Sequence, residues 1–257
     1  MPRPREKSPM FWRLAIGGML TGVFGLFALI AFNVPPATDL ETACRLDRKD
    51  PAHTVLLIDQ SDPFNPNDFG WVEEFVDAEA RLLPKYGRLT VLTPNVERPY
   101  DPVEVFSACS PGSAADANPI LENPRMIEAT WRTTFFEPLQ GRVAALLEET
   151  RQEASPLSEA IYSVADRADF KRGADNRRFV IVSDLMQHSD GFSFYKTGAD
   201  TAAFSDSRLG KEVPDMHGVD VVARIVPRNE YDLPMDAVKT FWASYFDGAG
   251  AQYRSVN

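Results

Sequence analysis

The sequence predicts an α/β domain with a Rossmann-like three-layer architecture, in which helices cover both faces of a mostly parallel sheet. Short apolar runs alternate with segments of helical period along the chain, a pattern typical of β/α units. Two of these runs, within residues 54–58 and 178–184, are continuously apolar and then stop at polar residues, as strands buried on both faces do. Right-handed crossovers between parallel strands place helices on both sides of the sheet.

The first 34 residues predict a membrane anchor. Residues 14–34 form a run of 21 residues without a charge, and about 20 apolar residues in a helix span the ~30 Å hydrocarbon core of a bilayer. A cleavable signal peptide has a shorter apolar core, about 7–15 residues, with a small-x-small cleavage site behind it. Pro35 and Pro36 occupy that place, so an uncleaved transmembrane helix is favoured over a long signal peptide.

The distribution of charge predicts the orientation of this anchor. Residues 1–13 carry four basic residues and one acid, and flanks rich in Lys and Arg stay in the cytoplasm. The rest of the chain holds 23 basic and 36 acidic residues. We therefore expect a single-pass protein of the cell membrane whose C-terminal domain is extracytoplasmic, and periplasmic in a Gram-negative cell. Its parts are a cytoplasmic tail (1–13), a transmembrane helix (14–34), a connector (35–52) and an α/β domain (53–257).

Composition narrows the class of protein. A net charge of −10 disfavours nucleic-acid binding, which needs clustered Lys and Arg. Two cysteines and three scattered histidines form no recognisable zinc motif. Cys44 and Cys109 both lie beyond the expected anchor, in a compartment where thiols are normally oxidised. We expect a disulfide between them; the alternative is two buried free thiols.

A helix is expected after the first strand. Asn67 would cap it, an apolar stripe at three- and four-residue spacing would face the core, and the helix would run to about Leu83. Pro84 and Gly87 then end it. The next segments are a second strand, an edge strand and a long loop that is either functional or a disordered insertion, at residues 88–93, 103–108 and 110–123.

The middle of the chain has a helical pattern. Residues 124–153 predict a helical stretch that Pro138 breaks in two. Ser155 and Pro156 are expected to open the following helix, as N-cap and first-turn proline. That helix should end near Phe170.

The last third of the chain returns to the β/α pattern. Residues 171–178 are expected as a basic connector before the second fully buried strand, and residues 185–214 as a long loop with room for one short helix. Residues 218–226 predict the last strand. Residues 234–246 predict a terminal helix whose aromatic face belongs to the core.

Polar residues at the strand ends predict the functional site. Asp59 and Ser61 directly follow the first strand, Ser155 starts a later helix, and Asp184 closes the strand after that. In open α/β sheets, ligands bind beyond the carboxyl ends of the strands. This order of residues resembles the metal-ion-dependent adhesion site of von Willebrand factor A domains, and the resemblance covers residues 53 to about 249.

The resemblance implies a ligand and a function. Such domains hold one divalent cation, and an all-oxygen ligand set suits Mg²⁺, which prefers octahedral geometry. The metal ligands would be Asp59, Ser61, Ser155 and Asp184, with Ser155 standing where threonine is usual. One coordination position stays open for an acidic side chain of a protein partner, so the implied function is protein binding without catalysis.

Two departures make the predicted site partly degenerate. Pro63 occupies the position of the second hydroxyl and has no side-chain oxygen, so Asp62, one residue earlier, becomes the compensating ligand. Leu185 stands where the family has glycine. In the alternative without a metal, Asp59 and Ser61 hydrogen-bond their own loop.

The expected function is therefore a membrane-anchored, extracytoplasmic protein-interaction module without enzymatic activity. The alternatives are a metal-free structural subunit of a membrane complex and a hydrolase that uses Asp59. Phosphatases with a strand-end aspartate want a second acid where Ser61 stands, and no Gly-x-Ser-x-Gly elbow is present. A catalytic Cys109 acting with His188 or His217 stays open.

Overall fold

The computed structural model describes residues 9–32, 35–47, 49–61, 66–118, 122–148, 152–172, 174–226 and 233–256. The chain divides into two compact units, residues 1–37 and residues 38–257. Residues 1–8 of the expected tail and residues 33 and 34 of the expected span lie outside the described residues.

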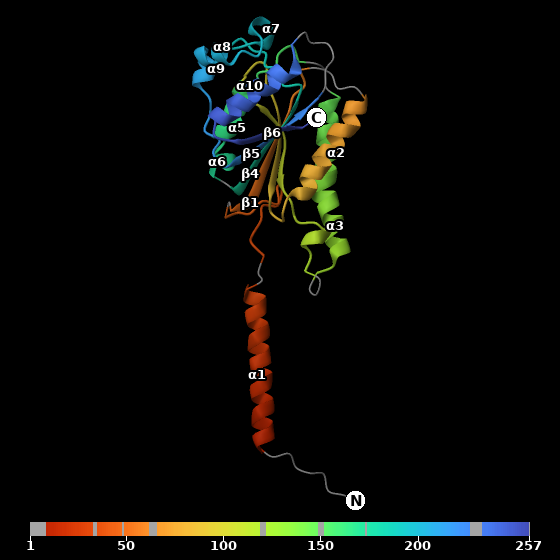
Figure 1. Cartoon of the computed structure of the whole chain (residues 1–257). Coiled ribbons are helices and arrows are strands. Elements are labelled where there is room, and N and C mark those ends of the chain that lie inside the picture. The colour runs from red at the N-terminus through yellow and green to blue at the C-terminus, as the bar shows by residue number, and fades with distance from the viewer. Residues whose placement is uncertain are drawn as a thin grey trace, which may run out of the picture. The chain divides into compact units, whose positions relative to one another are not determined.

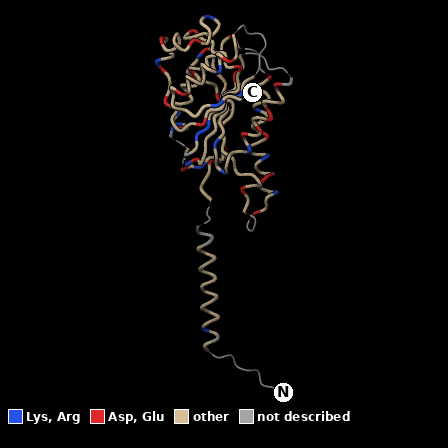
Figure 2. Tube along the Cα trace, viewed as in Figure 1, with Lys and Arg blue, Asp and Glu red and all other residues tan. Residues whose placement is uncertain are grey.

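The first unit contains helix α1 (Pro9–Phe32). Its apolar side chains are exposed: Leu14, Phe24 and Phe27 keep 69%, 76% and 67% of their surface accessible. Figure 2 shows this helix almost without charged positions. Among the residues that the structure describes, none of the helices combines the length and apolar character that crossing a bilayer requires.

The second unit is built on a six-stranded sheet in the order β3-β2-β1-β4-β5-β6. β3 pairs with β2 in antiparallel fashion, and the other neighbouring pairs are parallel. This arrangement confirms the predicted mostly parallel α/β sheet. The strands are β1 (Asp50–Ile58), β2 (Arg88–Thr93), β3 (Val103–Cys109), β4 (Ala174–Ser183), β5 (Val219–Ile225) and β6 (Gln252–Val256).

Helices cover both faces of the sheet, which makes three layers (Figure 1). One face carries α2 (Pro66–Leu82), α3 (Pro124–Trp131) and α4 (Glu137–Leu147). The other face carries α5 (Leu157–Asp166), α6 (Ala168–Arg172), α7 (Phe194–Thr197), α8 (Thr201–Asp206), α9 (Arg208–Lys211) and α10 (Met235–Gly248). Two shorter turns are η1 (Ala114–Asp116) and the π-helical turn η2 (Arg132–Phe136).

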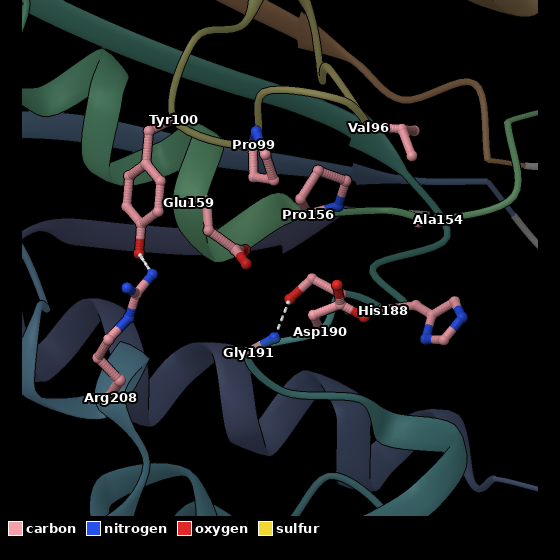
Figure 3. Close-up of a pocket in the computed structure, with 11 residues that line it drawn as sticks. Val96, Pro99, Tyr100, Ala154, Pro156, Glu159, His188, Asp190, Gly191 and Arg208 are labelled. Carbon is pink, nitrogen blue, oxygen red and sulfur yellow. Dashed lines mark hydrogen bonds between the residues drawn. The ribbon is translucent and has the colours of Figure 1, made fainter.

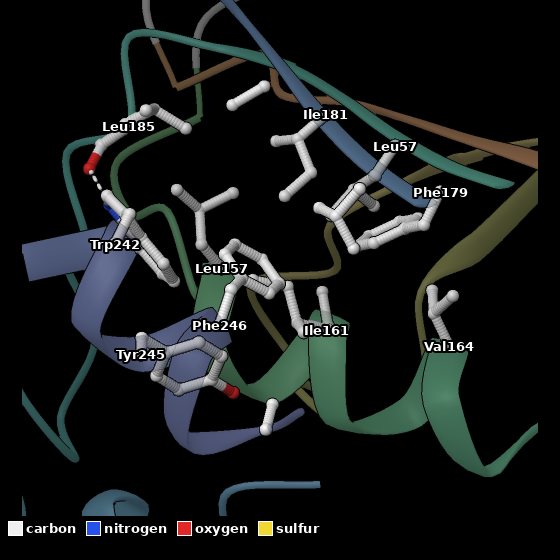
Figure 4. Packing of buried hydrophobic residues seen from close by; sticks show 14 of the residues in the cluster. Leu57, Leu157, Ile161, Val164, Phe179, Ile181, Leu185, Trp242, Tyr245 and Phe246 are labelled. Carbon is white, nitrogen blue, oxygen red and sulfur yellow. Dashed lines mark hydrogen bonds between the residues drawn. The ribbon is translucent and has the colours of Figure 1, made fainter. Parts of the chain in front are cut away.

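The core lies on both sides of β1, because successive side chains of a strand point to opposite faces. Val55 and Leu57 join the cluster under α5 and α10, whereas Leu56 and Ile58 join the cluster under α2 and α4. Figure 4 shows Leu57 packed with residues of α5 and α10. The aromatic face of α10 is buried here, which confirms its predicted place in the core.

The predicted break in the middle helices is confirmed in position, but its form is a π-helical turn. η2 separates α3 from α4, and α4 begins at Glu137. Pro138 lies in the first turn of α4, and the helical backbone continues into it from η2, where the N–H of Glu137 donates to the carbonyl of Arg132. The helix therefore changes its hydrogen-bond pattern just before the proline and does not end there.

Several predicted boundaries were wrong. β4 begins at Ala174, so most of the predicted connector 171–178 is strand, and the predicted loop 185–214 holds three short helices. β6 was not predicted, because its residues are polar and remain half-buried or exposed at the sheet edge. The predicted cap Asn67 lies inside α2, which begins at Pro66.

The expected disulfide is confirmed. Cys44 and Cys109 are bonded across 65 positions of sequence, with their Cα atoms 4.8 Å apart. The backbone N–H of Cys109 also donates to the carbonyl of Thr42 at 2.7 Å. The connector is thereby fixed to the end of β3, and closing a loop of this size stabilises the fold by about 4 kcal/mol on the chain-entropy estimate.

A buried histidine lies on β1. His53 is fully buried, and its Nε2 lies 2.9 Å from the hydroxyl oxygen of Thr90. Burial lowers the pKa of His53 to about 4 from a usual value of 6.5. At pH values between about 4 and 6.5, His53 therefore carries a proton in the unfolded chain but not in the folded chain.

Stability should therefore fall as pH decreases from 6.5 to about 4, and His53 should contribute to that loss. The contribution approaches about 1.4 kcal/mol per pH unit in the steepest part of this range. We expect His53→Gln to flatten the dependence of unfolding free energy on pH, measured by urea denaturation at several pH values. His217→Gln, at an exposed position, is the matched control and should keep the slope. Equal slopes in the wild type and His53→Gln would contradict this account.

Candidate functional site

The parallel register of β1 and β4 brings the predicted acids to one edge of the sheet. Ile58 lies opposite Val182, so Asp59 and Ser183 leave the sheet side by side. The backbone N–H of Asp59 donates to the carbonyl of Val182 at 2.9 Å, which continues the ladder past the end of β1. The carboxyl ends of these strands meet, as parallel pairing requires.

Three serine hydroxyls converge on one carboxylate oxygen. Oδ2 of Asp59 accepts from Oγ of Ser155 and Oγ of Ser183, both at 2.7 Å, and from Oγ of Ser61 at 3.1 Å. Oδ1 of Asp59 accepts from the backbone N–H of Ser61 at 3.0 Å. Asp59 keeps 4% of its surface accessible, and Ser155 and Ser183 are also buried. We call Asp59 with these three serines the Asp59 cluster.

Burial raises the pKa of Asp59 above its usual value, while the hydrogen bonds from Ser155, Ser183 and Ser61 act in the opposite direction. Removal from water disfavours the charged form of a carboxyl group, and hydrogen-bond donors partly compensate by stabilising that form. Asp59 is therefore a buried acid that gains from binding a proton or a cation more than an exposed aspartate would.

Asp184 lies beside this cluster. Its Oδ1 accepts from the backbone N–H of Met186 at 3.0 Å and lies 3.5 Å from Oγ of Ser183. The hydroxyl of Ser183 thus stands between the carboxyl groups of Asp59 and Asp184. Ser183 was not among the predicted site residues, although its place directly before Asp184 on a strand beside β1 was a usable signal.

Ser155 reaches the cluster in a different way from the one predicted. It does not cap α5, whose N-cap position is taken by Pro156. Ser155 instead forms a backbone bridge with His188, donating to its carbonyl at 2.8 Å and accepting from its N–H at 2.9 Å. This bridge leaves the Ser155 hydroxyl directed at Asp59.

Leu185 keeps the backbone conformation that glycine would adopt. Its φ is +65°, in the left-handed region, which costs a residue with a side chain roughly 1–2 kcal/mol. Its N–H donates to Oγ of Ser183 and its carbonyl accepts from Nε1 of Trp242, both at 2.8 Å. Its side chain is buried in the core (Figure 4), and this burial offsets the backbone cost.

The distances within the Asp59 cluster can be compared with those between the oxygens around a magnesium ion. Mg²⁺–O bonds of about 2.0–2.1 Å place neighbouring oxygens of an octahedron about 2.9 Å apart. The three hydroxyl oxygens lie 2.7–3.1 Å from Oδ2 of Asp59. Ordinary hydrogen bonds have the same oxygen–oxygen distances. These residues therefore fit either a bound cation or the metal-free alternative, in which they hydrogen-bond one another.

Other residues were predicted to contribute to the site. Among the described residues, no group of three or more His, Cys, Asp or Glu side chains is placed to hold a metal ion. Asp62 and Pro63 lie outside the described residues. Cys109 is bonded to Cys44, so the alternative of a catalytic Cys109 thiol is wrong.

An open pocket of 430 Å³ lies next to the Asp59 cluster. It includes Ala154 and Pro156, the two neighbours of Ser155 (Figure 3). Its other lining residues come from the loop after β2, the first turn of α5, the loop after β4 and α9: Val96, Pro99, Tyr100, Glu159, His188, Ser189, Asp190, Gly191 and Arg208. We call it the rim pocket.

No family model matches the chain, and no curated protein matches it. Similar solved structures include the conserved hypothetical protein BatB from Bacteroides thetaiotaomicron, with 10% identity and a TM-score of 0.41 over 80% of this chain and 90% of that one. Proximal thread matrix protein 1 from the mussel byssus, with a zinc-occupied MIDAS motif, has 15% identity and a TM-score of 0.41 over 82% of this chain and 43% of that one.

The pilus adhesin SpaC from Lactobacillus rhamnosus GG has 9% identity and a TM-score of 0.43, over 81% of this chain and 28% of that one. This chain thus spans less than half of the thread matrix protein and of the adhesin. Similarities at this level carry no argument about function, and the fold assignment rests on the strand order of the chain itself.

The hydrogen bonds of the Asp59 cluster predict a ranking of serine variants. Ser155→Ala removes a buried donor from a buried carboxyl group and should lower the unfolding free energy by about 1–3 kcal/mol. Ser61→Ala, at a half-buried position, should cost less because water can replace its hydroxyl. Urea denaturation of both variants measures the difference. A Ser155→Ala variant as stable as the wild type would show that this hydrogen bond has no net effect.

Proposed function

We propose that this chain is a membrane-anchored, extracytoplasmic protein-interaction module that binds its partner, without catalysis, at the carboxyl edge of the sheet. One observation carries the proposal: a buried acid surrounded by three hydroxyls lies at that edge, directly beside an open pocket on the same loops. Ligands of open α/β sheets bind at this edge. The resemblance of Asp59, Ser61, Ser155 and Asp184 to an adhesion site supports the same face.

The anchor is supported by the sequence. Residues 14–34 carry no charge, and the basic residues before them oppose an acidic remainder. α1 is helical over 24 residues and exposes large apolar side chains. A bilayer would cover such side chains, because apolar surface gains free energy on leaving water.

A divalent cation is the finer part of the proposal. Asp59, Ser61, Ser155 and Asp184 would hold it, and Ser183 lies within the same shell of oxygens. The bound cation would supply positive charge that attracts an acidic side chain of the partner. The hydroxyl groups would then turn their lone pairs toward the ion and give up their bonds to Asp59.

A metal-free structural subunit is the second candidate, and a specific observation favours it. Four donors already satisfy the carboxyl group of Asp59. A buried polar group that is fully hydrogen-bonded needs no ion. In this candidate the Asp59 cluster fixes the loops after β1 and β4 in place, and the partner contacts their outer surface.

The anchor predicts a topology. The chain is produced with a tag at its amino terminus, and protease is added to intact spheroplasts, outside the cell membrane. The protease should degrade residues 53–257 and spare the tag. Permeabilised cells are the control, in which both parts should be cleaved. A globular unit that survives protease in intact spheroplasts would contradict the proposed orientation.

The cation predicts a metal-dependent stability. For the detergent-solubilised full chain, Mg²⁺ at a hundred times its dissociation constant should stabilise the fold by about 2.7 kcal/mol. Thermal unfolding measures this as a rise in Tm, and a chelator should reverse it. Asp59→Asn and Asp184→Asn should abolish the response, whereas Asp215→Asn, at an exposed position, should keep it.

Partner capture by the same sample separates the two candidates. Capture that is lost with chelator and in both site variants supports the cation. Capture that persists in the presence of chelator, together with a Tm that does not change when Mg²⁺ is added, supports the metal-free subunit.

A further inference from the structure

The rim pocket contains a buried acid whose hydrogen bonding is incomplete. Glu159 lies in the first turn of α5 and keeps 3% of its surface accessible. Its Oε2 accepts from Nε2 of Gln187 at 3.2 Å. Among the described residues, no group donates to Oε1 of Glu159. Figure 3 shows the Glu159 carboxylate directed into the pocket.

The donor that Glu159 does have is shared. Nε2 of Gln187 also lies 3.1 Å from Oγ of Ser189 and 3.4 Å from the carbonyl oxygen of Phe192. One amide group thus serves three acceptors and contributes little to each. Oε1 of Glu159 faces the open pocket, so a ligand that brings a donor or a cation can reach it.

The charged side chains that line the rim pocket include two acids, Glu159 and Asp190, and one arginine, Arg208. Asp190 adds a second carboxyl group to the lining. Arg208 is the lining arginine, and its charge attracts Glu159, which is one of the acids that raise the pKa of Arg208. Its nitrogens donate elsewhere: Nη2 donates to the hydroxyl oxygen of Tyr100 at 3.0 Å, and Nε lies 3.5 Å from Oε1 of Glu212. The pocket therefore favours a ligand that brings positive charge.

The walls of the rim pocket favour an apolar group beside the charged group of the ligand. Val96, Pro99, Pro156 and the ring of Tyr100 present mainly carbon on the side of the β2 and α5 loops. Methylene groups gain free energy against such surfaces. A cation at the end of an alkyl chain satisfies both features, because its charged head reaches Glu159 while its stem contacts the walls.

The number of free oxygens distinguishes lysine from arginine. A guanidinium group binds carboxylates best through two parallel N–H bonds to both oxygens, whereas an ammonium group acts as a point charge. Only Oε1 of Glu159 is without a donor among the described residues, since Gln187 holds Oε2. A single oxygen suits an ammonium group.

We propose that the rim pocket receives the alkylammonium side chain of a lysine on a protein partner, with Glu159 as its counter-ion. This inference rests on the proposed binding role of the carboxyl edge and names the chemistry of the partner. The lysine head would bind Oε1 of Glu159, and Asp190 would add attraction at the mouth of the pocket.

The test uses small analogues and the detergent-solubilised full chain. N-acetyl-lysine methylamide is titrated by ligand-observed NMR beside the norleucine and arginine analogues of the same form. We expect the lysine analogue to bind most tightly, with an affinity that weakens as salt increases. Glu159→Gln should weaken it at least tenfold, whereas Glu137→Gln, at an exposed position on the opposite face of the sheet, should leave it unchanged. Asp190→Asn, on the surface of a loop, should weaken it less than tenfold.

Other outcomes would overturn the proposal. If the norleucine analogue binds as tightly as the lysine analogue, the pocket recognises only the alkyl chain and not the charge. If the arginine analogue binds more tightly than the lysine analogue, the argument from a single free oxygen is wrong. No titration by the lysine analogue in the folded wild-type chain would also exclude it. Partner capture keeps the two proposals distinct: a wild-type chain that binds the analogue but captures no protein refutes the module, and Glu159→Gln that captures its partner fully refutes the lysine site.

Discussion

The register of β1 against β4 is the constraint on which the rest of the second unit depends. Ile58 lies opposite Val182, and the carboxyl halves of both strands are buried on both faces. A slip of one residue would exchange the side chains of the two core clusters, because successive residues of a strand face opposite sides. It would also separate Asp59 from Ser183. Packing on the two faces and polar contacts at the edge therefore specify the same register.

The carboxyl edge combines a closed site with an open one. The carboxyl group of Asp59 is buried and accepts hydrogen bonds on both oxygens. The rim pocket beside it is open and holds Glu159, whose Oε2 accepts from Gln187. Ser155 joins the two, since its hydroxyl binds Asp59 and its neighbours Ala154 and Pro156 line the pocket. These bonds tie the loop that carries Ser155 to the end of β1.

Sequence patterns predicted the elements whose burial is continuous. β1, β2, β5 and α10 were found because their apolar residues leave a periodic or unbroken signal. β6 escaped because an edge strand with exposed polar residues has no such signal. The amino end of β4 escaped for a related reason, because Asn176 and Arg177 are polar. In the structure, Nδ2 of Asn176 donates to the carbonyl of Pro51 at 3.2 Å, and Nη2 of Arg177 donates to the carbonyl of His217 at 2.6 Å.

The candidate site was predicted less completely than the fold. Asp59, Ser61 and Asp184 could be placed from the strand ends, since parallel strands bring such residues to one edge. Ser183 was overlooked because a hydroxyl at the last position of a strand is ambiguous between the core and the rim. Glu159 was missed for a deeper reason, since an acid in the first turn of a helix is ordinary. Only the tertiary structure shows that Glu159 is buried and that Gln187 donates to its Oε2.

The disulfide has a mechanical consequence. Tension that enters the second unit from its amino-terminal side reaches Cys44 and passes directly to Cys109, which bypasses residues 45–108 between them. β1, α2 and β2 all lie inside this covalent loop, so they are not on the force-bearing path while the bond is intact. The load falls instead on the segments after Cys109, and reduction of the bond would transfer it to β1, the central strand that carries Asp59.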